Sequence, residues 1–105
     1  MALRDIPLRV PAGWRIETND YRRFDATDPS IHRYLKPGLL RAAHDARQRL
    51  LVVGWYPEDD EGGGWELALY DSATGARLRH RLTAWQDEIT DLIEDLFAAV
   101  ERGAI

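Results

Sequence analysis

The side chains best suited to metal binding or proton transfer are three histidines that lie far apart in the sequence. His32, His44 and His80 are separated by twelve and by thirty-six positions, and none has another histidine one helical turn away. Protein zinc sites usually combine closely spaced ligands, such as an i, i+4 histidine pair. The chain has no cysteine, which excludes thiolate metal sites, disulfides and thiol nucleophiles. We therefore expect neither a metal site nor a cofactor.

Other arrangements that carry chemistry are equally incomplete. Asp45 follows His44 and could orient it as a base, but no serine nucleophile motif accompanies the pair. His80 alternates with Leu78 and Leu82 on one predicted strand face, which favours a core or edge histidine held by a hydrogen bond. The glycine run 62–64 lacks the GK[ST] ending of a phosphate loop and follows acids that repel phosphate. Those acids also lack the ligand spacing of an EF-hand. The sequence predicts a protein that is not an enzyme.

Carboxylates form the clearest charged pattern. The net charge is −4, but residues 1–57 hold ten bases against six acids (+4), whereas residues 58–105 hold four bases against twelve acids (−8). An acidic total disfavours nucleic-acid binding, which depends on neutralised phosphates. The negative charge is concentrated in residues 58–61 and in the C-terminal segment 87–95. Each of these segments could be a solubilising surface or a surface that attracts a basic partner. The candidate partner-binding residues are Asp59, Asp60, Glu61, Asp87, Asp91, Glu94 and Asp95.

Two further groups of side chains leave alternative functions open. The aromatic residues Trp55, Tyr56 and Trp65 could surround a small-ligand pocket at the end of a central hairpin, although aromatic residues more often fill a core. The alternating residues 77, 79 and 81 are all arginine and are predicted to share one strand face, turned toward water or an acidic partner. That face could support self-association, so we expect a monomer or a weak homodimer.

Length and composition indicate one folded unit. A chain of 105 residues with 45% hydrophobic and 30% charged residues can bury a core without a disulfide. The first residues contain no apolar run typical of a signal peptide, and no stretch of 18 apolar residues is present. We expect a single domain over residues 1–105, in the cytoplasm and without membrane contact.

The elements that must position these side chains are predicted to form an α+β fold. It consists of an antiparallel sheet of about five to six strands, a short helix over 29–35, and one C-terminal amphipathic helix packed on one face. An extended, proline-framed arm over 6–13 comes first. The turn residues Asn19-Asp20 predict a hairpin between the first two strands. The predicted strands are 14–18, 21–25, 39–44 (favoured over a helix), 50–56 (buried on both faces), 65–71 and 76–82, with an exposed loop at 58–64.

The C-terminal helix has the strongest local pattern. Thr83 and Gln86 match a capping box, and Gly103 is a natural terminator. Apolar residues recur every three or four positions and predict one buried stripe. The stripe consists of Trp85, Ile89, Leu92, Ile93, Leu96, Phe97 and Val100. We expect this helix to lie on the sheet with its acids outward.

Three segments resemble a group of small bacterial proteins associated with immunity to polymorphic toxins. They are the arm with its following tryptophan (6–14), the central strand with Pro57-Glu58 (51–58), and Thr83 with Glu88-Ile89 and the final helix. The resemblance implies a cytosolic inhibitor that uses an acidic surface to mask a basic toxin or enzyme. The glycine run 62–64 and the thirteen arginines depart from the group, so no functional residue is carried over.

Overall fold

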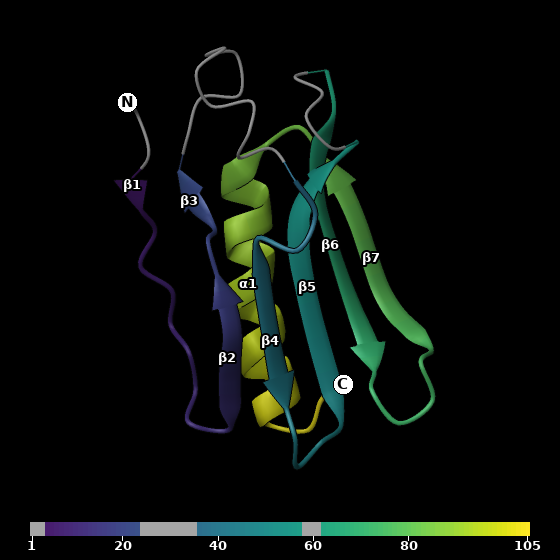
Figure 1. Ribbon diagram of the computed structural model, residues 1–105. Helices are drawn as coiled ribbons and strands as arrows, with labels where there is room; N and C mark the ends of the chain where they lie inside the picture. Colours follow the sequence, from purple (N-terminus) through teal and green to yellow (C-terminus); the bar gives the residue numbers. More distant parts are fainter. Residues whose placement is uncertain (1–3, 24–35, 58–61) are drawn as a thin grey trace.

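The computed structural model describes residues 4–23, 36–57 and 62–105, which form seven strands and one helix. The strands are β1 (Arg4–Asp5), β2 (Trp14–Asn19), β3 (Arg22–Arg23), β4 (Leu40–His44), β5 (Arg49–Tyr56), β6 (Gly64–Asp71) and β7 (Arg77–Thr83). The helix, α1, spans Gln86–Glu101. The fold is therefore α+β, as predicted (Figure 1). The short helix expected at 29–35 lies outside the described residues.

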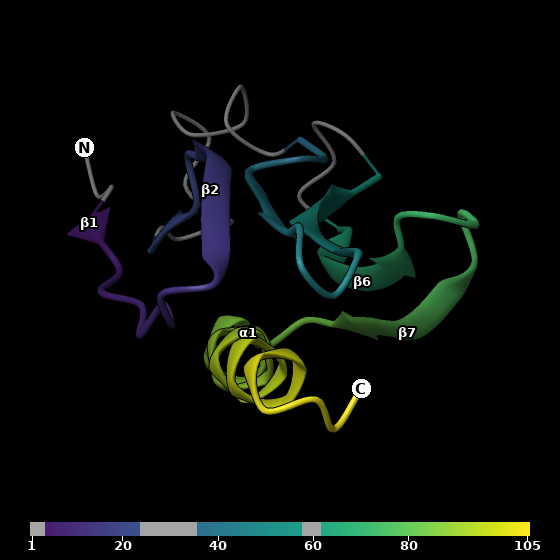
Figure 2. The same ribbon diagram turned by 90° about the horizontal axis from the view of Figure 1, so that it is seen from below.

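Five strands form one antiparallel sheet in the order β2-β4-β5-β6-β7, and β1 and β3 form a separate two-stranded pair. Figure 2 shows the sheet curving around α1, from β2 on one side to β7 on the other. A single helix therefore covers one face of the sheet. No helix in the described segments is long and apolar enough to cross a membrane.

The core lies between α1 and the concave face of the sheet. Ile89, Ile93, Phe97 and Val100 are fully buried on the helix. They pack against one side of β2, β4, β5 and β6, where the buried residues are Trp14, Leu40, Ala42, Leu51, Val53, Trp55, Trp65, Leu67 and Leu69. β7 adds the partly buried Leu78. Each large apolar side chain removed from water contributes about 1.5–3 kcal/mol before entropy is counted. The stripe thus stabilises a helix that would be marginal in isolation.

Two details of the predicted helix are wrong. Trp85 is 72% exposed because it stands at the N-cap, one residue before the helix begins. The capping box is also absent: the Gln86 amide donates to the Arg22 carbonyl, and Thr83 Oγ1 donates to Glu88 Oε2 at 3.0 Å. Gly103 does end the helix, with φ at 77° and Ala104 N–H donating to Ala99 O at 2.8 Å.

The hairpin predicted around Asn19-Asp20 does not form. β2 pairs with β4, whereas the following β3 pairs with β1. The reason lies in Tyr21, which is 1% exposed and packs edge-on against Trp65 in the core. Because Tyr21 must reach the core, the chain continues past Asn19-Asp20 instead of folding back. Residues 40–44 take the place beside β2, which confirms the strand expected at 39–44.

The strands predicted at 14–18, 50–56, 65–71 and 76–82 correspond to β2, β5, β6 and β7, with one correction at the central strand. Of the strand predicted at 21–25, only 22–23 forms a strand among the described residues, and 24–25 lie outside them. β5 occupies the middle of the sheet, but it is fully buried only toward α1: Leu50 and Val52 on its other face are half-buried. Gly54 is the buried exception on that face, because the segment 36–38 crosses directly over it. Trp55 N–H donates to the Lys36 carbonyl there at 2.9 Å. One helix supplies only one covering layer, so the opposite sheet face remains partly open.

Candidate functional site

The exposed side of α1 carries the predicted partner-binding residues that the structure describes. Asp87, Asp91 and Asp95 are exposed and follow one another at intervals of four residues, about one helical turn. We call these three residues the acidic row. Glu94 lies beside them and is half-buried. The other three candidates, Asp59, Asp60 and Glu61, lie outside the described residues.

Several carboxylates of α1 are held by groups elsewhere in the chain. Asp87 Oδ1 lies 2.5 Å from Arg23 Nη2, and Glu88 is ion-paired with Arg81. Glu94 Oε2 accepts the backbone N–H of Arg9 at 2.8 Å. These contacts offset the repulsion expected along an acidic helix face. Within the described part of the chain, Asp91 and Asp95 have no ion pair or side-chain hydrogen bond, so their charge remains available to an external cation.

A shallow groove runs beside the acidic row, between α1 and the N-terminal arm. The hydrogen bond from Arg9 N–H to Glu94 holds the arm, residues 6–13, against the helix. At the end of the arm, Trp14 N–H donates to Pro11 O at 3.1 Å and closes a turn into β2. The groove has a volume of about 540 Å³ and is lined by Arg9, Val10, Pro11, Glu94, Asp95 and Ala98. We call it the arm–helix groove.

The lining of the arm–helix groove is suited to a basic side chain. Val10, Pro11 and Ala98 offer apolar surface on which the methylene stem of a lysine or arginine can pack. Asp95 also lines the groove, and Asp91 lies one turn away on α1. Arg9 also lines the groove and donates its backbone N–H to Glu94, while its guanidinium adds a positive charge that the carboxylates of Glu94 and Asp95 must outweigh. The described lining thus combines apolar surface with the carboxylates of Glu94 and Asp95.

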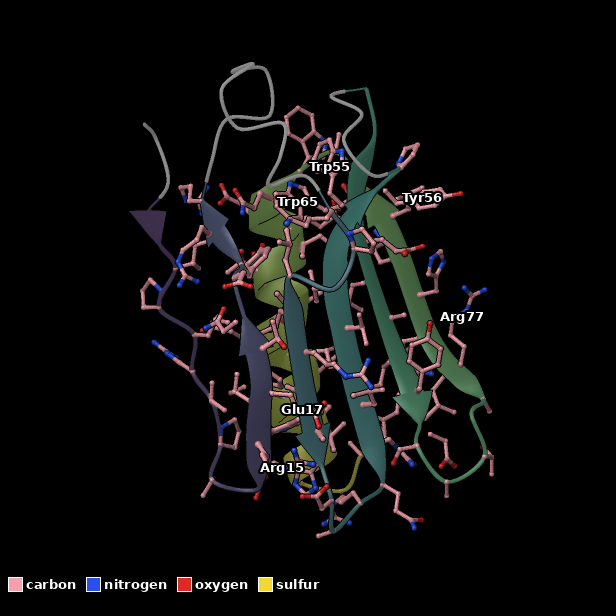
Figure 3. The ribbon with its side chains drawn as sticks, in the orientation of Figure 1. Arg15, Glu17, Trp55, Tyr56, Trp65 and Arg77 are labelled. Carbon is pink, nitrogen blue, oxygen red and sulfur yellow. The ribbon has the colours of Figure 1, made fainter. Side chains whose placement is uncertain are left out.

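A cluster of ion pairs on the outer face of the sheet connects β2 with β4 and the turn that follows it. Arg15 donates to both oxygens of Asp45 (3.1 and 3.2 Å) and to Glu17 Oε2 at 2.9 Å, and Arg41 donates to Glu17 Oε1 at 2.9 Å (Figure 3). The Arg15 hydrogen bonds lower the pKa of Asp45 and, together with Arg41, that of Glu17. Asp45 in turn raises the pKa of Arg15. The cluster links β2 to β4, and sequence reasoning missed it because the register of that pair was unknown.

The two described histidines have structural partners. His44 is 4% exposed and its Nε2 lies 2.9 Å from Glu101 Oε2, while its Nδ1 accepts the Arg47 N–H at 3.3 Å. Asp45 binds Arg15 instead, so the suggested His44–Asp45 pair is wrong. His80 lies on the edge strand β7, and its Nε2 is 3.0 Å from Glu66 Oε2 on β6. This confirms the prediction of an edge histidine held by a hydrogen bond. Over residues 4–23, 36–57 and 62–105, no three His, Cys, Asp or Glu side chains are grouped to hold a metal.

The aromatic residues considered as a pocket separate into core and surface. Trp55 and Trp65 are each 3% exposed and pack edge-to-face at 5.2 Å, whereas Tyr56 is 57% exposed. A depression of about 380 Å³ does lie at this end of the hairpin, lined by Tyr56, Pro57, Gly62, Gly63, Gly64, Leu82, Thr83 and Ala84. Neither tryptophan lines this depression, so of the three aromatic residues considered only Tyr56 borders it.

The three arginines of β7 do not share one face. Arg79 is opposite Leu69 and Arg81 is opposite Leu67, so both lie on the α1 side, because directly opposite residues share a face. Arg77 is opposite Tyr70 instead, because the register shifts between Leu69 and Tyr70. The shift places Leu78 as an extra residue that packs against the core. Strict alternation, on which the sequence prediction relied, fails at this bulge.

Comparison with protein-family models, with curated proteins and with solved structures finds no match to this chain.

Proposed function

We propose that this chain is a non-enzymatic binding protein of the cytoplasm that uses the arm–helix groove and the acidic row to cover a basic surface of another protein. The observation that carries the proposal is the position of Asp91 and Asp95. Both are exposed, both lack an ion-pairing partner among the described residues, and Asp95 lines a groove with apolar walls. The proposed contacts also include Asp87, Glu94 and the acidic residues Asp59, Asp60 and Glu61.

The most specific form of this proposal is an immunity-type inhibitor that masks a toxin. A nuclease toxin must present positive charge to hold its substrate, and an acidic domain can occupy the same surface without any chemistry. The negative half of the chain would also raise the rate of encounter with such a partner. Support for this form comes from the resemblance of segments 6–14, 51–58 and 83–101 to immunity proteins.

The test is a growth-protection experiment with any toxin found to be encoded beside the gene. Cells that carry such a toxin should survive when the chain is co-expressed and should lose protection with D91K/D95K. The matched control is D20K/E66K, which changes the net charge by the same amount on residues outside α1. Protection by the control but not by D91K/D95K supports the proposal. If the purified chain binds none of those toxins and the cells die, the proposal fails.

A further inference from the structure

The outer edge of β7 is an open strand edge. β7 is the last strand in the sheet order, and among the described residues no strand pairs with its outer side. Figures 1 and 2 show it at the margin of the molecule. In an antiparallel sheet, an edge strand directs alternate backbone N–H and C=O groups outward. Its seven residues, Arg77–Thr83, therefore form a template for another extended segment.

The charges on β7 select the kind of segment that can pair with it. The strand carries Arg77, Arg79 and Arg81 and no acid. Arg81 is neutralised by Glu88, whereas Arg77 and Arg79 are exposed and form no ion pair with any other described residue. An antiparallel pairing of two β7 strands would bring these arginines together and is opposed by their repulsion. An incoming strand with carboxylates would pair with them instead.

An apolar groove beside the edge gives the incoming strand a second point of contact. It lies between β7 and α1, has a volume of about 220 Å³, and is lined by Leu67, Arg79, His80, Arg81, Leu92 and Leu96. Leu92 and Leu96 are half-buried members of the predicted helix stripe that the sheet does not cover completely. The groove is small, and its lining combines three leucines with Arg79, which forms no ion pair with a described residue. It therefore fits an apolar side chain flanked by carboxylates.

The geometry points to β7 and this groove as a docking site for an extended acidic segment of a partner protein, added to the sheet as a sixth strand. Because Arg77 and Arg79 lie on opposite faces of the sheet, the segment would carry a carboxylate on each of its faces, and one apolar residue would enter the groove. The backbone hydrogen bonds would supply affinity and the arginines would supply selectivity. This site is separate from the acidic row and has the opposite charge, so it does not depend on the proposed function.

The test uses fluorescence anisotropy with short labelled peptides and the full chain. An acidic peptide that repeats two glutamates followed by two valines carries carboxylates on both faces of the extended chain and should bind, whereas its counterpart with lysine in place of glutamate should not. The R77E/R79E variant should bind the acidic peptide at least about tenfold more weakly, while R47E/R102E, with the same change in net charge, should bind like the wild type. Circular dichroism of each variant verifies folding. Failure of the acidic peptide to bind, or equal loss in both variants, overturns the inference.

Two further measurements distinguish strand addition at β7 from charge attraction alone and from pairing with a second copy of the chain. An acidic peptide with every backbone nitrogen methylated keeps its charge but has no backbone donor on either edge, so it should not bind. Equal binding would show attraction without strand addition and would overturn the inference. Sedimentation at low and high salt tests a second copy as the occupant: a dimer that R77E/R79E abolishes would also overturn it. D91K/D95K should leave peptide binding intact, so failure here is distinct from failure of the proposed function.

Discussion

Arg15 controls the ionisation of two carboxylates on the outer sheet face. Its guanidinium lies 2.9 Å from Glu17 and 3.1 Å from Asp45, and these hydrogen bonds lower the pKa of both acids. A lowered pKa in the folded state means that the unfolded state binds protons more readily. The stabilisation by these pairs is therefore present at neutral pH and is lost as the pH falls through the lowered pKa values.

Replacement of Arg15 by glutamine should raise the pKa of Asp45 and of Glu17 toward their ordinary values, because the donors and the positive charge are removed. The shift should be larger for Asp45, since Glu17 keeps its contact with Arg41. Carboxyl-carbon NMR titration measures both values directly. The Arg102→Gln variant, changed far from the cluster, should leave them unaltered. Unchanged titration of Asp45 in Arg15→Gln would contradict the assignment.

Gly54 is required for a close approach of two backbone segments. A Cβ at this position would lie 2.6 Å from Pro37 Cα and from Gly38 N, and 2.8 Å from the Lys36 carbonyl oxygen. Gly54→Ala should therefore destabilise the fold by about 1–3 kcal/mol, the range for overpacked sites. Urea denaturation measures the loss. Gly38→Asn is the control, since it adds a side chain in open space and asparagine tolerates the φ of 70°. A smaller effect at Gly54 than at Gly38 would refute the crowding argument.

At the scale of elements, α1 is the only covering layer over the described sheet, and Phe97 is its central contact. Phe97 is fully buried, lies 4.7 Å from the Trp14 ring, and its carbonyl accepts the Trp14 indole N–H at 3.0 Å. Phe97→Ala should cost about 3–5 kcal/mol of unfolding free energy, from lost burial and a residual cavity. Thermal and urea unfolding measure this value. Asp91→Ala, on the opposite side of α1, should change it by less than about 0.5 kcal/mol.

The sequence predicts those elements whose pattern is local. The apolar stripe of α1 repeats every three or four residues within one segment, and Gly103 marks the end of the helix. The helix could therefore be located from the residues alone. β5, β6 and β7 were predicted for the same reason, because each combines a run of strand-forming residues with turn residues at its ends. The exposed carboxylates Asp91 and Asp95 then follow directly from the position of the stripe.

Features that depend on pairing between distant segments could not be predicted. Asn19-Asp20 has the composition of a hairpin turn, but the burial of Tyr21 against Trp65 outweighs it. The register shift near Tyr70 separates Arg77 from Arg79, and no local pattern in the sequence marks it. The arm–helix groove likewise depends on where residues 9–11 meet α1, a contact that joins positions 85 residues apart. In each case a long-range contact decides between locally equivalent choices.

At the scale of the whole molecule, the shared core predicts one cooperative unit. Trp14, Trp55 and Trp65 contribute to the same cluster as the stripe of α1, and β2 and β7 both border it. Tryptophan fluorescence and the helical circular dichroism signal should therefore report the same urea midpoint. A Trp85→Phe background removes the exposed indole from the fluorescence signal. Two separated midpoints would show that α1 or the arm unfolds independently, which would argue against a single domain over 1–105.

Because Trp85 is exposed, its fluorescence can report binding near the start of α1. Three of the four tryptophans are 3–6% exposed, whereas Trp85 is 72% exposed at the start of α1. A collisional quencher such as acrylamide should therefore extinguish mainly the Trp85 emission. Any macromolecule that shields the first turn of α1 would slow that quenching, so binding there can be followed without a dye or tag.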